Sequence, residues 1–177
     1  RRELYIFTDL ARAAWNPETN KAQVTEEQVV VFSLAEELYG LDISRVQGII
    51  KMPEVTRVPR AAEFVEGVIT LRGEIVPIID LRKRFGLRQQ ENGVDTRIIN
   101  VEMGDHLVGL IVDAVEEVLN IPSDVIEPPP DLVTTVDSAY LRGIAKLEER
   151  LVILLDLDRV LSTTEQQAIG RLSAEAV

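Results

Sequence analysis

The sequence predicts a mainly β protein made of two small antiparallel β-barrels that share an apolar seam. One observation is an internal duplication, in which residues 30–53 align with 99–122, and 64–85 align with 140–161, without a gap in either block. Another is that β-branched and apolar residues alternate over short segments between tight turns, with no long crossover helix. A unit this small is marginally stable alone, so the two copies should bury apolar surface against each other.

The first block of the first unit should be a hairpin followed by a short helical turn. Residues 28–34 alternate in the way of a half-buried strand, and 38–43 should run back beside it after a tight turn. Asp42 or Ser44 is placed to cap a helical turn, because short polar side chains accept bonds from free amides at helix starts. Extended structure should then continue up to Pro53.

The second block should begin with a short helix over 61–66. Two strands, 68–71 and 75–79, should follow as a hairpin whose turn at 72–74 contains a glycine. A polar turn over 80–85 should close the unit, with the aspartate at its start bonded to free amides of that turn.

The second unit repeats this order with an insertion over 123–139. Three consecutive prolines in it remove three backbone donors, which predicts an exposed, stiff loop in place of a central strand. Beyond the repeat, Ser162 and Glu165 have the spacing of a capping box, which predicts a helix to the C-terminus. The predicted organisation is an N-terminal lead of unknown role over 1–27, a first barrel over 28–88, a linker over 89–95, a second barrel over 96–161 and a helix over 162–177.

Composition excludes several functions for this 177-residue chain. The net charge of -11 argues against nucleic acid as a partner, since a phosphate backbone requires clustered cations. The absence of cysteine excludes disulfides and thiolate chemistry. No run approaches the roughly 18 apolar residues that span a bilayer. A cytoplasmic protein without direct membrane insertion is expected.

Side chains suited to catalysis are few. The single histidine, His106, falls at a hairpin turn, where a solvated turn residue is a better interpretation than a base or a metal ligand. Asp80 and Asp156 occupy equivalent places, and an acid pair would require both carboxyls to line one pocket. Helix capping explains the two aspartates better. We expect no enzyme, no metal and no cofactor.

The two hairpin tips differ in sequence where the units are otherwise alike. Arg72, Gly73 and Glu74 stand in the first tip, where the second has Glu148, Glu149 and Arg150. Glycine permits a tight turn that presents the arginine. Two interpretations remain open: a solvated turn arginine, or an arginine that forms a bidentate contact with a partner's carboxylate.

The residues 67–86, G-V-I-T-L-R-G-E-I-V-P-I-I-D-L-R-K-R-F-G, strongly resemble the signature of the CheW family, the coupling proteins of bacterial chemotaxis. Residues 39–43, 109–113 and 127–130 carry the same resemblance, which extends from 28 to about 161. It implies two intertwined, five-stranded SH3-like β-barrels with short helices, a C-terminal helix and no catalysis. Gly48 departs from the family, which commonly has a glutamate there, and Thr70 replaces its usual asparagine.

The resemblance also implies partners. Such proteins bridge the cytoplasmic tips of chemoreceptors to the regulatory domain of the histidine kinase CheA, and they join membrane-bound receptor arrays only through these partners. In the family the receptor's helical hairpin docks in a groove between the barrels. The receptor-binding positions carried over are Val46, Gly48, Gly67, Arg72 and Arg97. For the kinase contact we expect Glu127, Asp131, Leu132, Met52 and Val55.

Two other functions stay open on the sequence alone. The same motifs occur in the CheW-like domain of CheA and in the CheW half of CheV, so the chain could be a fragment of either. A general peptide-binding barrel pair would take proline-rich segments on exposed aromatic side chains. Only 5% of the residues are aromatic, which disfavours that function.

Overall fold

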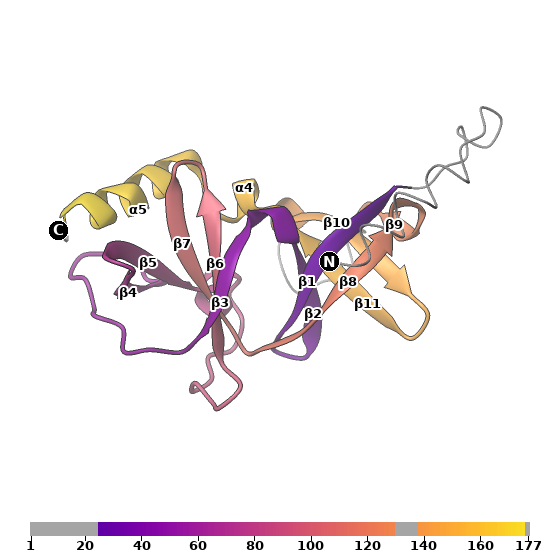
Figure 1. The fold of residues 1–177 in the computed structure, drawn as a ribbon, viewed down its shortest axis with the longest axis horizontal. Coiled ribbons are helices and arrows are strands. Elements are labelled where there is room, and N and C mark those ends of the chain that lie inside the picture. The colour runs from indigo at the N-terminus through magenta and orange to yellow at the C-terminus, as the bar shows by residue number, and fades with distance from the viewer. Residues whose placement is uncertain (1–24, 130–137, 176–177) are drawn as a thin grey trace.

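The computed structural model describes residues 25–129 and 138–175, which form a mainly β fold of two sheets placed side by side (Figure 1). Sheet A contains, in spatial order, β8 (Ala114–Pro122), β1 (Glu26–Leu34), β2 (Glu37–Asp42), β11 (Arg150–Leu155), β10 (Leu141–Leu147) and β9 (Ile126–Glu127). Sheet B contains β3 (Val46–Lys51), β6 (Arg97–Met103), β7 (His106–Val112), β5 (Glu74–Asp80) and β4 (Val65–Leu71). The prediction of a mainly β protein is confirmed.

Helical segments lie between these strands and after the last of them. They are the 3-10 turns η1 (Ile43–Arg45), η2 (Ser123–Val125) and η3 (Ser138–Tyr140), and the α-helices α3 (Leu81–Arg84), α4 (Leu157–Val160) and α5 (Thr163–Glu175). The predicted caps are present, since Asp42 accepts the amide of Ser44 at 2.9 Å and Asp80 accepts that of Arg82 at 2.9 Å. Asp156 does the same at the start of α4.

The two sequence units exchange their hairpins. Sheet A joins β1 and β2 of the first unit to four strands of the second, and sheet B joins β6 and β7 of the second unit to three strands of the first. Parallel pairs hold the exchange, with Tyr39 opposite Ile153 and Gly109 opposite Ile78. The units are therefore intertwined, and the predicted division into consecutive barrels over 28–88 and 96–161 does not describe the sheets.

The chain crosses between the sheets at places the sequence did not reveal. One crossing is the η1 turn between β2 and β3, and the other is Asp113 between β7 and β8. The predicted linker over 89–95 instead connects α3, the helix that follows β5, to β6, and both β5 and β6 belong to sheet B. Linker-like composition marked a loop correctly, but it carried no information on which strands that loop joins.

In each sheet, the chain segment that follows the strand at one edge pairs with a strand at the opposite side of the same sheet. Beyond β8, strand β9 pairs with β10, where Glu127 lies opposite Ile144. Beyond β3, Thr56 bonds in both directions to Val68 of β4, at 2.9 and 2.8 Å. Sheet A has six strands, not the five expected, because β9 forms a separate strand. Since β9 lies at an edge and the prolines follow it, the expectation that the insertion contains no central strand is confirmed for its described part.

The predicted apolar seam is the largest core cluster, and it lies between the sheets. Strands of both sheets contribute to it, together with side chains of α3, α4 and α5. Four aromatic rings stack in sequence through it, with centroids 5.8, 6.0 and 5.3 Å apart: Phe32, Tyr39, Phe85 and Tyr140. Each sheet also has a smaller core on its other face.

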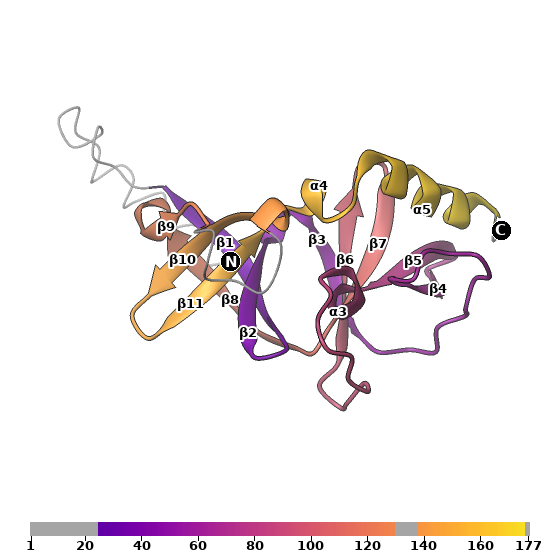
Figure 2. The same cartoon turned by 180° about the vertical axis from the view of Figure 1, so that it is seen from behind.

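Helix α5 confirms the predicted capping box. The hydroxyl of Ser162 accepts the amide of Glu165 at 3.1 Å, and the Glu165 carboxylate accepts the amide of Ser162 at 2.8 Å. Buried Ile169 fixes the helix to the shared core, and α5 lies along sheet B (Figure 2). No helix in the described ranges has the length and apolar character needed to cross a membrane.

The predicted helix over 61–66 is wrong. The amide of Val65 donates to the carbonyl of Ala62 at 2.9 Å in a turn, and β4 begins at Val65. Helical spacing of apolar residues was misleading here, because the strand pairing of β4 with β5 outweighs the weak local preference.

Candidate functional site

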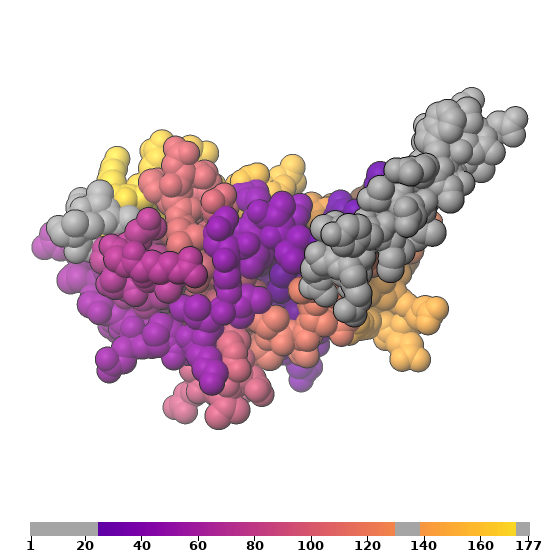
Figure 3. Space-filling model, in the orientation of Figure 1, coloured from indigo at the N-terminus to yellow at the C-terminus, as the bar shows by residue number. Residues whose placement is uncertain are grey.

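A groove of about 690 Å³ opens on sheet B. It is bordered by β3, by the tip of the β4–β5 hairpin and by the β6–β7 hairpin, which lie on the face shown in Figure 3. Its lining residues from β3 and the β4–β5 hairpin are Gln47, Gly48, Ile49, Ile50, Leu71, Arg72 and Glu74. Those from β6 and β7 are Asn100, Glu102, Gly104, Asp105, His106 and Leu107. Of the five predicted receptor-binding positions, Gly48 and Arg72 lie in this groove.

The β4–β5 tip presents Arg72 as predicted. The turn has two central residues, Arg72 with φ 52° and Gly73 with φ 81°. Positive φ at both positions matches the right-handed twist of the flanking strands. The arginine is exposed and forms no hydrogen bond or ion pair among the described residues, so its guanidinium is free to bind a partner. In the other hairpin neither Glu148 nor Glu149 has positive φ.

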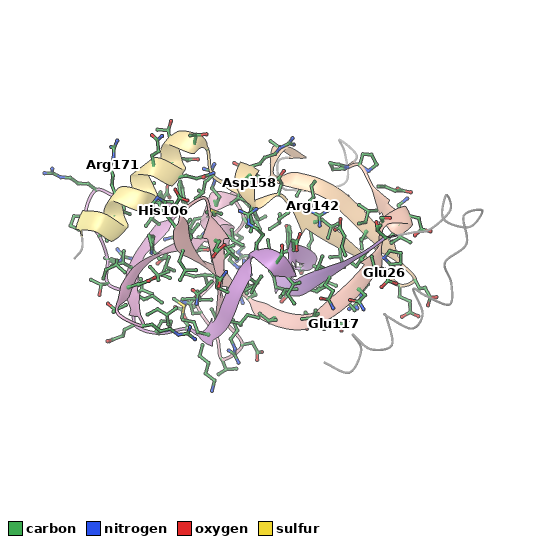
Figure 4. The ribbon with its side chains drawn as sticks, turned by 45° about the horizontal axis from the view of Figure 1, so that its top comes forward. Glu26, His106, Glu117, Arg142, Asp158 and Arg171 are labelled. Carbon is green, nitrogen blue, oxygen red and sulfur yellow. The ribbon has the colours of Figure 1, made fainter. Side chains whose placement is uncertain are left out.

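The groove stays open because Gly48 carries no side chain. An added Cβ at Gly48 would meet nothing within 4 Å. At the equivalent place on sheet A stands Glu117 (Figure 4), and its carboxylate pairs with Arg150 of the β10–β11 hairpin at 2.6 Å. On sheet B these two places hold Gly48 and Glu74, which form no such pair. The two copies therefore differ at this edge: an ion pair spans it on sheet A, and an open groove lies at the equivalent place on sheet B.

Asn100 lies in the floor of this groove and is a residue that the sequence reasoning missed. It is 2% exposed, and its Oδ1 has no hydrogen-bond partner among the described residues. The side chain lies between two glycines, since Asn100 is opposite Gly48 on one side and Gly109 on the other. The alignment of the units contained a signal, because it matches this polar residue with Val31 of the first unit.

The other three predicted receptor positions lie outside the groove. Val46 is half-buried against the shared core, on the opposite face of β3. The guanidinium of Arg97 donates to the carbonyls of Val94 and Thr96 at 2.8 and 2.9 Å. Gly67 occupies a bulge in β4, and its role there is backbone geometry.

An exposed apolar side chain on β3 was also missed. Ile49 is 41% exposed and borders the groove, and Val118 at the equivalent place on β8 is 50% exposed. Both strands are sheet edges. A β-bulge between Val46 and Gly48 changes the alternation, so Ile49, opposite Ile99, lies on the same face of β3 as Val46 and meets the groove only along the open edge of the strand.

The predicted kinase-binding residues divide into three groups. Met52 and Val55 are half-buried against the smaller core of sheet B, where they support the fold. Glu127 is exposed and pairs with Lys146 at 2.8 Å. Asp131 and Leu132 lie outside the described residues.

The candidate catalytic side chains have structural partners. Asp80 and Asp156 cap α3 and α4, and in the described ranges the two line no common pocket. Burial is the main cause that raises the pKa of Asp80 above its ordinary value. The expectation of a solvated His106 is wrong, because its ring is half-buried beside α5, 2.3 Å from where a Cβ at Gly170 would stand (Figure 4). No group of three metal-ligating side chains occurs among the described residues.

Known proteins resemble this chain in sequence and in structure. The family model described as "CheW-like domain" matches residues 28–165. The "Chemotaxis protein CheW" of Klebsiella aerogenes is 37% identical over 147 residues, which cover 83% of this chain and 89% of that protein. The protein of the same name from Treponema pallidum is 37% identical over 151 residues, covering 82% and 88%. The crystal structure of the scaffolding protein TtCheW from Thermoanaerobacter tengcongensis superposes with a TM-score of 0.74 at 48% identity, covering 80% of this chain and 96% of that one.

Proposed function

Because this chain belongs to the family of CheW-like domains, we propose that it is a non-catalytic adaptor that couples chemoreceptors to the histidine kinase CheA in chemotaxis signalling. The match across residues 28–165 carries this proposal. The relatives named above are CheW proteins and not kinases, which favours the adaptor over a fragment of CheA or CheV. We place the protein in the cytoplasm, attached to receptor arrays through its partners.

The groove on sheet B is the surface we assign to the receptor tip. It combines a free arginine at one rim, Arg72, with an exposed apolar side chain, Ile49, at the edge strand. A helical hairpin lying along the open edge of β3 would cover Ile49 at that edge and place a carboxylate against the guanidinium of Arg72. Of the positions carried over from the family, Gly48 and Arg72 touch this surface directly, and Gly67 acts by shaping β4.

Arg72→Glu should weaken binding to a receptor-tip fragment by at least about tenfold, since it replaces an attraction for a carboxylate by a repulsion. Binding to the CheA regulatory domain should change less than about twofold, and thermal unfolding should stay the same because Arg72 has no partner in the fold. Isothermal titration with each partner measures both affinities. An equal loss for both partners, with normal unfolding, would show that the two surfaces are assigned wrongly.

For the kinase we assign the proline-rich insertion, through Glu127, Asp131 and Leu132. Leu132→Ser should weaken association with the CheA regulatory domain and leave receptor binding intact, because it removes an apolar side chain from that loop alone. Together with Arg72→Glu it forms a reciprocal pair of variants, each the control for the other. If kinase binding and array assembly are unchanged in Leu132→Ser, the insertion is not the kinase contact.

The two competing functions lack support in the described residues. A general peptide-binding module would need exposed aromatic rings, but the stacked rings of the shared core are buried or half-buried and Phe64 is half-buried beside them. An acid-pair enzyme would need Asp80 and Asp156 in one pocket, and each of them instead caps its own helix.

A further inference from the structure

Equivalent cross-strand rows on the two sheets differ in polarity. On sheet A the row across β8, β1, β2 and β11 consists of Glu117, Val31, Gly40 and Leu154. On sheet B the equivalent row across β3, β6, β7 and β5 consists of Gly48, Asn100, Gly109 and Ile78. The last two positions are alike, so the difference lies in the first two. Where sheet A has buried Val31 and the side chain of Glu117, sheet B has the amide Asn100 and Gly48, which carries no side chain.

Folding gives no reason for the amide. A buried acceptor without a partner costs free energy, because it loses its bonds to water and gains none in return. Val31 shows that a valine fits the equivalent place, where it is fully buried. Asn100 is nearly as buried, yet its Oδ1 is unpartnered among the described residues. A donor from outside the described fold is therefore left to satisfy this oxygen, either water or a side chain of a partner.

The surroundings of Asn100 give such a group access. The neighbouring Gly48 leaves open space on one side. On the other side the side-chain oxygen leans over β7, 3.2 Å from where a Cβ at Gly109 would stand. On sheet A the ion pair of Glu117 with Arg150 spans the corresponding edge.

The charges at the rim indicate what kind of group enters. Glu74, Glu102 and Asp105 are exposed lining residues, and among the described residues their carboxylates form no ion pair. They outnumber the cation Arg72, and His106 is half-buried beside α5. An unpartnered acceptor below a mainly acidic rim suits a long cationic side chain that can donate hydrogen bonds.

We propose that the groove takes up a lysine or arginine side chain from the receptor's helical hairpin, whose N–H donates to Oδ1 of Asn100. This rests on the adaptor function proposed above and adds to it a residue that decides which receptor tips bind. The inserted cation and the carboxylate held by Arg72 together would fix the orientation of the hairpin in the groove.

The test compares Asn100→Val with Asn100→Thr, because valine and threonine share one shape and only threonine keeps an acceptor. The probe is a soluble helical-hairpin fragment of a chemoreceptor tip from the same organism, titrated calorimetrically. Asn100→Val should unfold at a higher temperature than the wild type and bind the fragment about tenfold more weakly, as expected for losing a hydrogen bond to a charged group. Asn100→Thr should bind within about threefold of the wild type.

Substitutions in the receptor fragment provide a second measurement, in which the wild-type adaptor is used first and its folding is not altered. Each lysine and arginine of the fragment is replaced by methionine, and binding to the wild-type protein is measured. One replacement should cause the same tenfold loss, and combining it with Asn100→Val should cause no further loss. If no basic residue of the fragment affects binding, or if Asn100→Val binds as the wild type does, the inference is overturned while the adaptor function stands. A wild-type protein that binds no receptor tip would overturn both.

Discussion

Gly67→Ala should lower the free energy of unfolding by roughly 3–5 kcal/mol, the largest effect we expect from a single methyl group in this protein. Gly67 has φ 152°, a conformation that L side chains rarely adopt. An added Cβ would lie 2.1 Å from the carbonyl oxygen of Thr56, which is backbone. That carbonyl accepts the amide of Val68 at 2.8 Å, so it cannot move without breaking the bridge to β4. Urea unfolding followed by circular dichroism measures the loss.

Two other glycines separate the causes of this effect. Gly73 has φ 81° but open space around it, so Gly73→Ala should cost only the backbone strain, about 1 kcal/mol. Gly48 has neither a positive φ nor a neighbour, so Gly48→Ala should change stability by less than about 0.5 kcal/mol. Similar losses at all three positions would mean that the bulge at Gly67 is not the structural constraint described here. If Gly67→Ala is destabilised as expected, any loss of receptor binding in this variant follows from the damage to β4.

Arg84→Met should lower the free energy of unfolding by about 2–3 kcal/mol and loosen α5. The guanidinium donates to both carboxylate oxygens of Glu165, at 3.0 and 2.8 Å, and to the carbonyl of Val160 at 2.7 Å. It also lies over two aromatic rings, 4.8 Å from the centroid of Phe64 and 5.2 Å from that of Tyr140. Methionine keeps the apolar stem but leaves a half-buried carboxylate without its partner.

Amide hydrogen exchange tests where the Arg84 effect acts. Protection should fall mainly in α5, because its capping residue Glu165 loses the arginine that holds it to α3. The matched control is Lys146→Ala, which breaks the exposed pair with Glu127 and should cost less than about 1 kcal/mol, since solvent screens such pairs. If both variants lose the same stability, or if α5 keeps its protection, Arg84 does not anchor the helix.

Much of the local structure could be predicted because its causes are local. The hairpins follow from alternation and turn residues, and the helix starts follow from Asp42, Asp80 and Ser162, whose side chains bond to amides two or three residues away. The family could also be predicted, since long motifs recur in order. The tip at Arg72 was found by comparing the two units.

The candidate site was predicted only in part. Gly48 and Arg72 meet in one groove, but Val46 lies behind the sheet because a bulge changes the alternation of β3. Arg97 folds onto nearby carbonyls, a contact that spacing does not indicate. Asn100 was missed because a polar residue in an apolar strand gives no sign of whether its partner is inside the fold, in another molecule or absent.

Most of the elements, their order, the caps and the family follow from the amino-acid sequence alone, since each depends on neighbouring residues or on motifs read along the chain, although the helix expected over 61–66 is absent. The resemblance implied intertwined units, but the packed fold was needed to show which hairpins are exchanged and that Gly48, Asn100 and Arg72 border one groove. Strand pairing and burial join residues far apart in the chain, and local patterns do not specify these long-range partners. The same alternating pattern is satisfied by several partners, and only the packed fold selects one.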